Sequence, residues 1–315
     1  MSAFHAATGF EFGICTFCPE DAMSISPVEL LSWYDHARRD LPWRRPGVSA
    51  WQILVSEFML QQTPVSRVEP IWSAWIERWP TASATAAAGP AEVLRAWGKL
   101  GYPRRAKRLH ECAVVIASEY DDVVPRDVDT LLTLPGIGAY TARAVACFAY
   151  QASVPVVDTN VRRVVTRAVH GAADAPASTR DLDMVAALLP PDTTAPTFSA
   201  ALMELGATVC TARSPRCGIC PLSHCRWRSA GFPAGTVARR VQRYAGTDRQ
   251  VRGKLLDVLR DSTTPVTRAQ LDVVWLSDPA QRDRALDSLL VDGLVEQTAD
   301  GRFALAGEGE TGRPA

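Results

Sequence analysis

Two carboxylates, Glu57 and Asp158, stand in contrasting surroundings in this sequence. Glu57 lies within WQILVSEFMLQQT, where apolar residues recur at helical spacing, so its carboxyl is expected on an almost wholly apolar helix. Burial there would raise its pKa and make it a proton donor. Asp158 follows the apolar run 154–157 and heads the next helical stretch, where its carboxylate would cap the helix. An acid beside an ionised carboxylate is the pair that cleavage of a glycosidic bond requires.

Each carboxylate also has a purely structural interpretation. A buried salt bridge to an arginine would explain Glu57, and helix capping alone would explain Asp158. The surrounding motifs must therefore decide between the structural and the catalytic interpretation.

The stretch LPGIGAYTARA, residues 134–144, places two glycines between two helical segments. Gly136 and Gly138 would leave backbone N–H groups uncovered, which forms a site for one phosphate at the start of the second helix. Ordinary helix–helix turns use glycine as well. Together with the flanking helices the stretch forms a helix–hairpin–helix, an arrangement that binds the DNA backbone without base-specific contacts.

Four of the eight cysteines fall within CTARSPRCGICPLSHC, residues 210–225. Four thiolates in so short a loop indicate one metal centre rather than unliganded core residues. Zinc and an iron–sulfur cluster are both compatible with this donor set. The candidate ligands are Cys210, Cys217, Cys220 and Cys225.

These residues must be positioned by helices, because helical periodicity continues from about residue 27 to 228. Ser26 is predicted to cap the first helix, with Pro27 as its first residue and Glu29 returning the cap. No alternating apolar stretch of strand length occurs before residue 290, so this part should be all-α.

The C-terminal part differs, because it is predicted to form three short helices and a hairpin that turns at Gly301. That order is typical of a winged helix, a module that binds either DNA or protein. We expect an N-terminal extension without regular structure (1–23), a helical core (24–228), a linker (229–247), a small α+β winged-helix-like module (248–307) and a tail (308–315).

The composition, with 47% hydrophobic and 22% charged residues, is that of a folded globular protein. No apolar run reaches the roughly 18 residues that span a bilayer, and no export signal is evident. We therefore expect a cytoplasmic protein with no membrane partner. The formal net charge is zero, which by itself does not indicate a nucleic-acid partner. Arginine clusters, however, would give either a basic face or ordinary solvated helix surfaces.

Several motifs together resemble those of one family. They are LPWR, SEFMLQQT, GKLGY, LPGIGAYTA, VVDTNVRR, ALMELGATVC and the four-cysteine loop. Over about two-thirds of its length the chain closely resembles the helix–hairpin–helix DNA glycosylases, and within them the MutY-type adenine DNA glycosylases. The resemblance implies two helical lobes around a cleft, a 4Fe–4S cluster rather than zinc, and a monomer acting on nucleoid DNA. Its partner would be duplex DNA with adenine opposite 8-oxoguanine or guanine.

The resemblance also implies roles for individual residues. Glu57 would protonate N7 of a flipped-out adenine, and Asp158 would stabilise the sugar cation. Tyr140 and Asn160 would hydrogen-bond around the two carboxylates. Further contacts to the base or the DNA would come from Trp43, Arg44, Leu60, Gln61, Gln62, Thr63, Tyr102, Gly136, Gly138 and Arg162.

The chain departs from the family pattern at several points. Thr159 replaces a usual glycine, Pro103 replaces a common second tyrosine, and Ala200 stands where relatives often have Gln or Glu. The last cysteine gap has four residues, where five are common. The family's Nudix-like C-terminal domain, which checks for 8-oxoguanine, is not recognisable, so the sequence does not define how strongly that base is preferred.

Three functions compete at this point. The first is a glycosylase that removes adenine only; the second is an endonuclease III-like enzyme that removes oxidised pyrimidines and cuts the strand. The third is a catalytically silent lesion-binding protein. Strand cutting needs an amine, and the resembling lyases have a lysine where this chain has Tyr140. Because both carboxylates are present, the first function is favoured.

Overall fold

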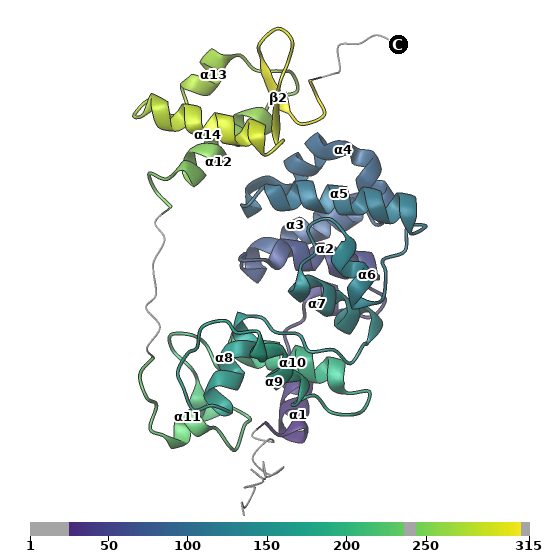
Figure 1. Cartoon of the computed structure of the whole chain (residues 1–315), viewed down its shortest axis with the longest axis vertical. Helices are drawn as coiled ribbons and strands as arrows, with labels where there is room; N and C mark the ends of the chain where they lie inside the picture. Colours follow the sequence, from purple (N-terminus) through teal and green to yellow (C-terminus); the bar gives the residue numbers. More distant parts are fainter. Residues whose placement is uncertain (1–24, 236–243, 310–315) are drawn as a thin grey trace, which may run out of the picture.

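The computed structural model describes residues 25–235 and 244–309 (Figure 1). The predicted extension 1–23, part of the predicted linker and most of the predicted tail lie outside these described residues. The described chain is mostly helical, with one two-stranded antiparallel sheet near its end. The all-α prediction for the first part is thus confirmed, and no described helix is long and apolar enough to cross a membrane.

One lobe is built from consecutive helices around a tryptophan-rich core. Trp75 packs edge-on against both Trp79 and Trp97, at ring-centroid distances of 4.8 and 6.2 Å. Such aromatic pairs bury a large area and fix the helices against one another. The helices are α2 (Ala50–Leu60), α3 (Val65–Arg78), α4 (Ala82–Trp97), α5 (Arg104–Glu119), α6 (Val128–Thr133) and α7 (Ala139–Tyr150).

The second lobe combines the first described helix with helices that follow α7 in the chain (Figure 1). Here α1 packs on α10, and α10 packs on α8. The chain therefore crosses between the lobes twice, so that the lobe of α2–α7 faces the lobe of α1 and α8–α11 across one cleft. The helices are α1 (Pro27–Ala37), α8 (Thr159–Ala168), α9 (Arg180–Ala186), α10 (Ala195–Thr208) and α11 (Arg226–Ser229).

The start of α1 confirms half of the predicted cap. The hydroxyl of Ser26 accepts from the backbone N–H of Glu29, and Pro27 is the first helical residue. The sequence predicted that the Glu29 carboxylate would bond back to the backbone N–H of Ser26, but it does not. It accepts instead from the backbone N–H of Ser223 at 3.1 Å, so it joins α1 to the cysteine loop.

The helix–hairpin–helix consists of α6, the turn of residues 134–138 and α7, as predicted. Its two glycines differ in what they face. Gly136 has φ +78°, and a Cβ added there would lie 2.6 Å from the Cβ of Arg108 and 3.0 Å from the Phe58 ring. Gly138 caps α7 with an extended backbone, and a Cβ there would meet nothing within 4 Å. Gly136 thus permits close packing, while only Gly138 leaves open space at the helix N-terminus.

The C-terminal module has the predicted order of three helices and a hairpin, and Gly301 supplies the positive φ of the turn at +81°. Val295 pairs with Leu305 in the antiparallel register. The elements are α12 (Asp248–Arg260), α13 (Arg268–Asp272), α14 (Pro279–Val291), β1 (Val295–Gln297) and β2 (Phe303–Leu305).

This module packs against the first lobe rather than standing apart from it (Figure 1). Apolar side chains of α12 and β2 belong to the same buried cluster as those of α4 and α5. Arg95 on α4 pairs with Glu308 at 2.5 Å, and its second nitrogen donates to the carbonyl of Ser262. The position of the module is therefore fixed by both apolar and charged contacts.

Candidate active site

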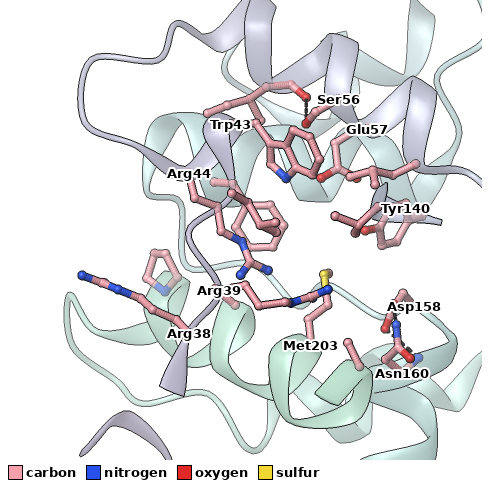
Figure 2. A pocket seen from close by; sticks show the side chains of 18 of the residues that line it. Arg38, Arg39, Trp43, Arg44, Ser56, Glu57, Tyr140, Asp158, Asn160 and Met203 are labelled. Atoms are coloured by element: carbon pink, nitrogen blue, oxygen red, sulfur yellow. Dashed lines mark hydrogen bonds between the residues drawn. The ribbon is translucent and has the colours of Figure 1, made fainter. Parts of the chain in front are cut away.

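A cavity of about 1020 Å³ lies between the two lobes. Trp43 and Glu57 reach it from the α2 side, whereas Asp158, Asn160 and Met203 reach it from the α8 and α10 side (Figure 2). Residues that are distant in sequence are thus brought together, as the two-lobed arrangement requires. The predicted site residues that line it are Trp43, Arg44, Glu57, Leu60, Gln61, Gln62, Thr63, Tyr140, Asp158, Asn160 and Arg162.

Glu57 is 7% exposed and belongs to the buried face of α2. Burial raises the pKa of this carboxyl to about 7, because the charged form loses its hydration. A hydrogen bond with Tyr140 lowers the pKa in part, the charge of Asp158 raises it further, and Arg44 lowers it. Near neutral pH the group is therefore divided between an acid that can donate a proton and a carboxylate.

Asp158 is the N-cap of α8, and its carboxylate has specific donors. Oδ1 accepts from the backbone N–H groups of Asn160 at 2.8 Å and Val161 at 2.7 Å. Oδ2 accepts from the side-chain amide of Asn160 at 2.7 Å. Burial raises the pKa of Asp158, while these hydrogen bonds lower it. The capping interpretation is thus correct in structure, and the capped carboxylate still faces the cavity.

Tyr140 stands beside Glu57 and is half-buried (Figure 2). Burial first, then the charges of Glu57 and Asp158, raise the pKa of its hydroxyl well above the usual value. The phenol therefore remains protonated and acts as a hydrogen-bond donor to Glu57. It offers no amine to the cavity.

Arg44 is held by a residue that the sequence analysis missed. Glu204 on α10 is fully buried and accepts from Arg44 at 2.8 Å and from Arg39 at 2.6 Å. Burial raises the pKa of Glu204, but the bonds to the two arginines outweigh it, so the pKa is lowered. An acidic residue on the apolar helix ALMELG was the feature that could have indicated such a pair.

The wall of the cavity next to these charges is apolar. Trp43 lies edge-on against Trp72 at 5.7 Å and is 6% exposed. Met203 and Ala200 contribute the α10 side of the cavity. Because Ala200 has no polar atom beyond its backbone, this position cannot contact a base as Gln or Glu would.

Arg105 forms several hydrogen bonds to the loop that follows α2. Its Nη1 donates to the carbonyls of Phe58, Met59 and Gln61 at 2.8, 3.1 and 2.6 Å; its Nη2 donates to Thr63 at 3.0 Å and Gly101 at 3.3 Å. Burial lowers the pKa of Arg105 to about 10. This side chain joins the loop of Gln61 and Thr63 to the loop of Tyr102. No local motif marked it.

The remaining predicted contacts lie elsewhere. Tyr102, Gly136 and Gly138 do not line the cavity. Tyr102 is 41% exposed and Gly138 is also exposed, so both are accessible outside the cavity. Arg162 lines the cavity, but its Nε donates to Asp181 at 2.5 Å, which limits its freedom to contact DNA.

The four cysteines of residues 210–225 line one small cavity of about 20 Å³ beside α8 and α11. Arg167 donates to the Cys210 sulfur at 3.4 Å and lies over the Trp227 ring at 4.5 Å. No described group of His, Cys, Asp or Glu is arranged about a single metal ion. Four thiols around a common cavity, with a guanidinium beside one of them, fit the donor set that an anionic iron–sulfur cluster needs.

Comparison with known proteins defines the class first. Residues 55–182 match the model of the HhH-GPD superfamily base excision DNA repair proteins. The solved structure of a thermostable thymine-DNA glycosylase superposes with a TM-score of 0.59 at 28% identity, covering 64% of this chain and 94% of that one. A non-covalent endonuclease III–DNA complex, with a TM-score of 0.56 over 65% of this chain and 94% of that one, shares the fold at 23% identity. The fold and the cleft are those of a base excision repair DNA glycosylase.

Sequence relatives narrow this class. An adenine DNA glycosylase of Mycobacterium tuberculosis is 70% identical over 288 residues, which cover 90% of this chain and 95% of that protein. The human adenine DNA glycosylase is 43% identical over 211 residues, or 63% of this chain and 38% of that protein. The chain belongs to the adenine DNA glycosylases.

The cysteine loop has its own match. Residues 210–224 match the iron–sulfur binding domain of endonuclease III. The expectation of a 4Fe–4S cluster is confirmed. The match ends one residue before Cys225, the last of the four candidate ligands. Bound through the four cysteines, the cluster would cross-link the loop that follows α10.

Proposed function

We propose that this protein removes adenine from duplex DNA where adenine faces 8-oxoguanine or guanine, and that it stops once the base is released. The observation that supports this most is Glu57, a buried carboxyl with a pKa of about 7 that shares a cavity with Asp158. In this proposal the core of residues 24–228 carries the chemistry, acting as a monomer on nucleoid DNA.

The first step is the opening of the duplex. An adenine in a base stack cannot reach a cavity between two lobes, so it must be flipped out, which costs a few kcal/mol of stacking and pairing. The loop of Gln61, Gln62 and Thr63 borders the cavity and would fill the gap that the base leaves. Gly138 would hold a phosphate at the N-terminus of α7.

The second step is the cleavage of the glycosidic bond. Protonated Glu57 donates its proton to N7 of the adenine, and the bond between the base and the sugar carbon breaks with its electrons going to the base. Asp158 stays ionised, because three donors hold its carboxylate, and it stabilises the sugar cation. Water then adds to the sugar carbon and returns a proton to Glu57.

The absence of strand cutting follows from position 140. A lyase forms a Schiff base between an amine and the sugar, and Tyr140 stands at the place beside the acid where resembling lyases have lysine. The endonuclease III-like alternative is therefore disfavoured. The buried acid at position 57 also disfavours a silent lesion-binding protein, since burying a carboxyl that Tyr140 only partly compensates costs free energy with no chemical role to explain it.

A single-turnover assay tests the proposal. We expect adenine release from duplexes with 8-oxoguanine or guanine opposite, and much slower release with cytosine opposite. The product strand should remain intact until alkali is added. Strand cleavage with a borohydride-trappable adduct, or release of an oxidised pyrimidine instead of adenine, would refute the proposal.

A further inference from the structure

Five side chains form a continuous row that alternates aromatic rings with guanidinium groups. Arg105 lies 5.2 Å from the ring centroid of the buried Trp97 and 5.3 Å from that of Tyr102. Arg249 lies 5.8 Å from the Tyr102 ring and 5.6 Å from the Tyr244 ring. In contacts of this kind the negative face of each ring attracts the neighbouring guanidinium group. The row leads from the core of the first lobe to the C-terminal module.

Tyr102 occupies the middle of this row and is held in an unusual conformation. Its φ is +50°, a region that residues with a side chain rarely adopt. Its hydroxyl accepts from Nη1 of Arg249 at 3.0 Å, while Arg105 fixes the preceding carbonyl of Gly101. Both the backbone and the ring of Tyr102 are thus fixed by arginines, one from the lobe and one from the module.

The module presents Arg249 from a fixed position. Arg252 on α12 and Arg104 at the start of α5 both pair with Asp292, whose side chain is 4% exposed. Lys107 on α5 donates to the carbonyl of Asp292 at 3.0 Å. These bonds hold the start of α12, which carries Arg249, next to the start of α5, which follows Tyr102.

The charges of the row also indicate an anionic partner. The contacts that Arg105 and Arg249 make in the described chain go to carbonyls, hydroxyls and rings, and none of them goes to a carboxylate. The positive charge of these two guanidinium groups, which lie beside one exposed ring, is therefore not neutralised by a bonded carboxylate of the described chain. A phosphate of the DNA backbone would neutralise it.

We propose that Arg249 is a positioning residue for Tyr102. It holds the Tyr102 ring in the orientation in which the ring enters the base stack, so a module outside the helix–hairpin–helix core takes part in opening the duplex. This inference rests on the proposed function, and it extends the filling of the opened stack from Gln61, Gln62 and Thr63 to Tyr102, whose loop Arg105 joins to theirs. It assigns the C-terminal module a role without requiring that the module read a base.

The test uses the full-length protein and a duplex that carries 2-aminopurine beside the target adenine, since its fluorescence rises when the stack opens. We expect Arg249→Ala to slow opening about five- to tenfold, because Tyr102 loses its hydrogen bond and its cation–π contact with Arg249. Arg249→Lys should restore part of the rate, because the cation remains. Arg284→Ala, which removes an exposed arginine of α14, serves as the matched control and should leave opening unchanged.

A double-mutant cycle separates positioning from simple attraction to phosphate. If Arg249 acts through Tyr102, Arg249→Ala should have no further effect on opening once Tyr102→Ala is present. An equal effect of Arg249→Ala in the unmodified protein and in Tyr102→Ala would show that Arg249 only attracts phosphate, and it would overturn the inference. Normal opening in Arg249→Ala alone would overturn it as well. Because fluorescence reports opening and not chemistry, failure of adenine release in the unmodified protein would refute the proposed function alone.

Discussion

Arg44 and the buried Glu204 form an ion pair, 2.8 Å long, at the wall of the cavity that Glu57 and Asp158 share. Arg44 is near enough to Glu57 to lower its pKa, yet its guanidinium is bonded to Glu204 and not to Glu57. Glu204 thus keeps a cation beside the acid without letting it neutralise the acid. This arrangement explains how Glu57 keeps a pKa near 7 in the presence of an arginine.

The first prediction concerns Glu204→Gln, which removes this carboxylate but keeps its shape. Arg44 should then interact more strongly with Glu57, so the pKa of Glu57 should fall. The rate of adenine release should decrease at neutral pH. In the pH–rate profile, the fall in rate on the alkaline side should move to lower pH. Because Arg39 and Arg44 also lose a buried partner, we expect a loss of about 1–3 kcal/mol in the free energy of unfolding in urea.

A pH–rate profile of adenine release distinguishes this effect from general destabilisation. Arg39→Gln removes the other arginine of the pair and leaves the bond between Arg44 and Glu204. It should reduce stability without moving the alkaline limb. A profile that is identical for Glu204→Gln and the unmodified protein would contradict the role assigned to Glu204.

The second prediction concerns Glu57→Gln and Asp158→Asn. Each should reduce single-turnover release by about 10²–10⁴-fold, since each removes a group that acts in the transition state. Binding to the mispaired duplex, followed by fluorescence anisotropy, should remain close to normal. Asn at position 158 can still accept from Val161, so α8 should stay capped. Near-normal turnover in either variant would disprove the assignment.

The third prediction follows from the raised pKa of Glu57, from 4.5 to about 7. Between these two values the unfolded chain loses the proton while the folded protein keeps it, so the stability contributed by this group falls as the pH rises. The loss should be complete above about pH 7. In Glu57→Gln, the free energy of unfolding should therefore not show this decline with rising pH. An equal decline in both proteins would mean that Glu57 is ionised throughout.

The same protonation should appear in the kinetics. For the free enzyme, kcat/KM should fall with a slope of one on a logarithmic scale above about pH 7, because only protonated Glu57 can donate. Asp158 is expected to remain ionised on the acid side until its own raised pKa is reached. A rate that rises steadily from pH 6 to pH 9 would be incompatible with an acid at position 57.

Local features of the site could be predicted from the sequence. The capping position of Asp158, the apolar helix around Glu57 and the hairpin before α7 depend on residues within a few positions of each other. Each of them is found in the structure as expected. Their chemistry could be anticipated because burial and helix capping act over short stretches of chain.

Long-range contacts could not be predicted in this way. Glu204 lies 165 and 160 residues from the arginines that it binds, and Glu29 contacts a residue 194 positions away. The sequence pattern near Glu29 was consistent with a reciprocal cap, and only the folded arrangement of α1 and the cysteine loop decides between the two partners. The attachment of the C-terminal module to α4 and α5 depends on contacts of the same kind.

The final prediction uses the two hairpin glycines as a matched pair. Gly136→Ala should destabilise the protein by about 2–4 kcal/mol, because alanine is strained at φ +78° and its Cβ would clash with Arg108. Gly138→Ala should change stability little, since its φ of −99° suits any residue and the added Cβ meets no protein atom. Its methyl group would instead occupy the space where a phosphate approaches the start of α7. We therefore expect normal thermal unfolding but weaker binding to every duplex, matched or mispaired, in Gly138→Ala. Normal DNA affinity in this variant would show that the phosphate site lies elsewhere.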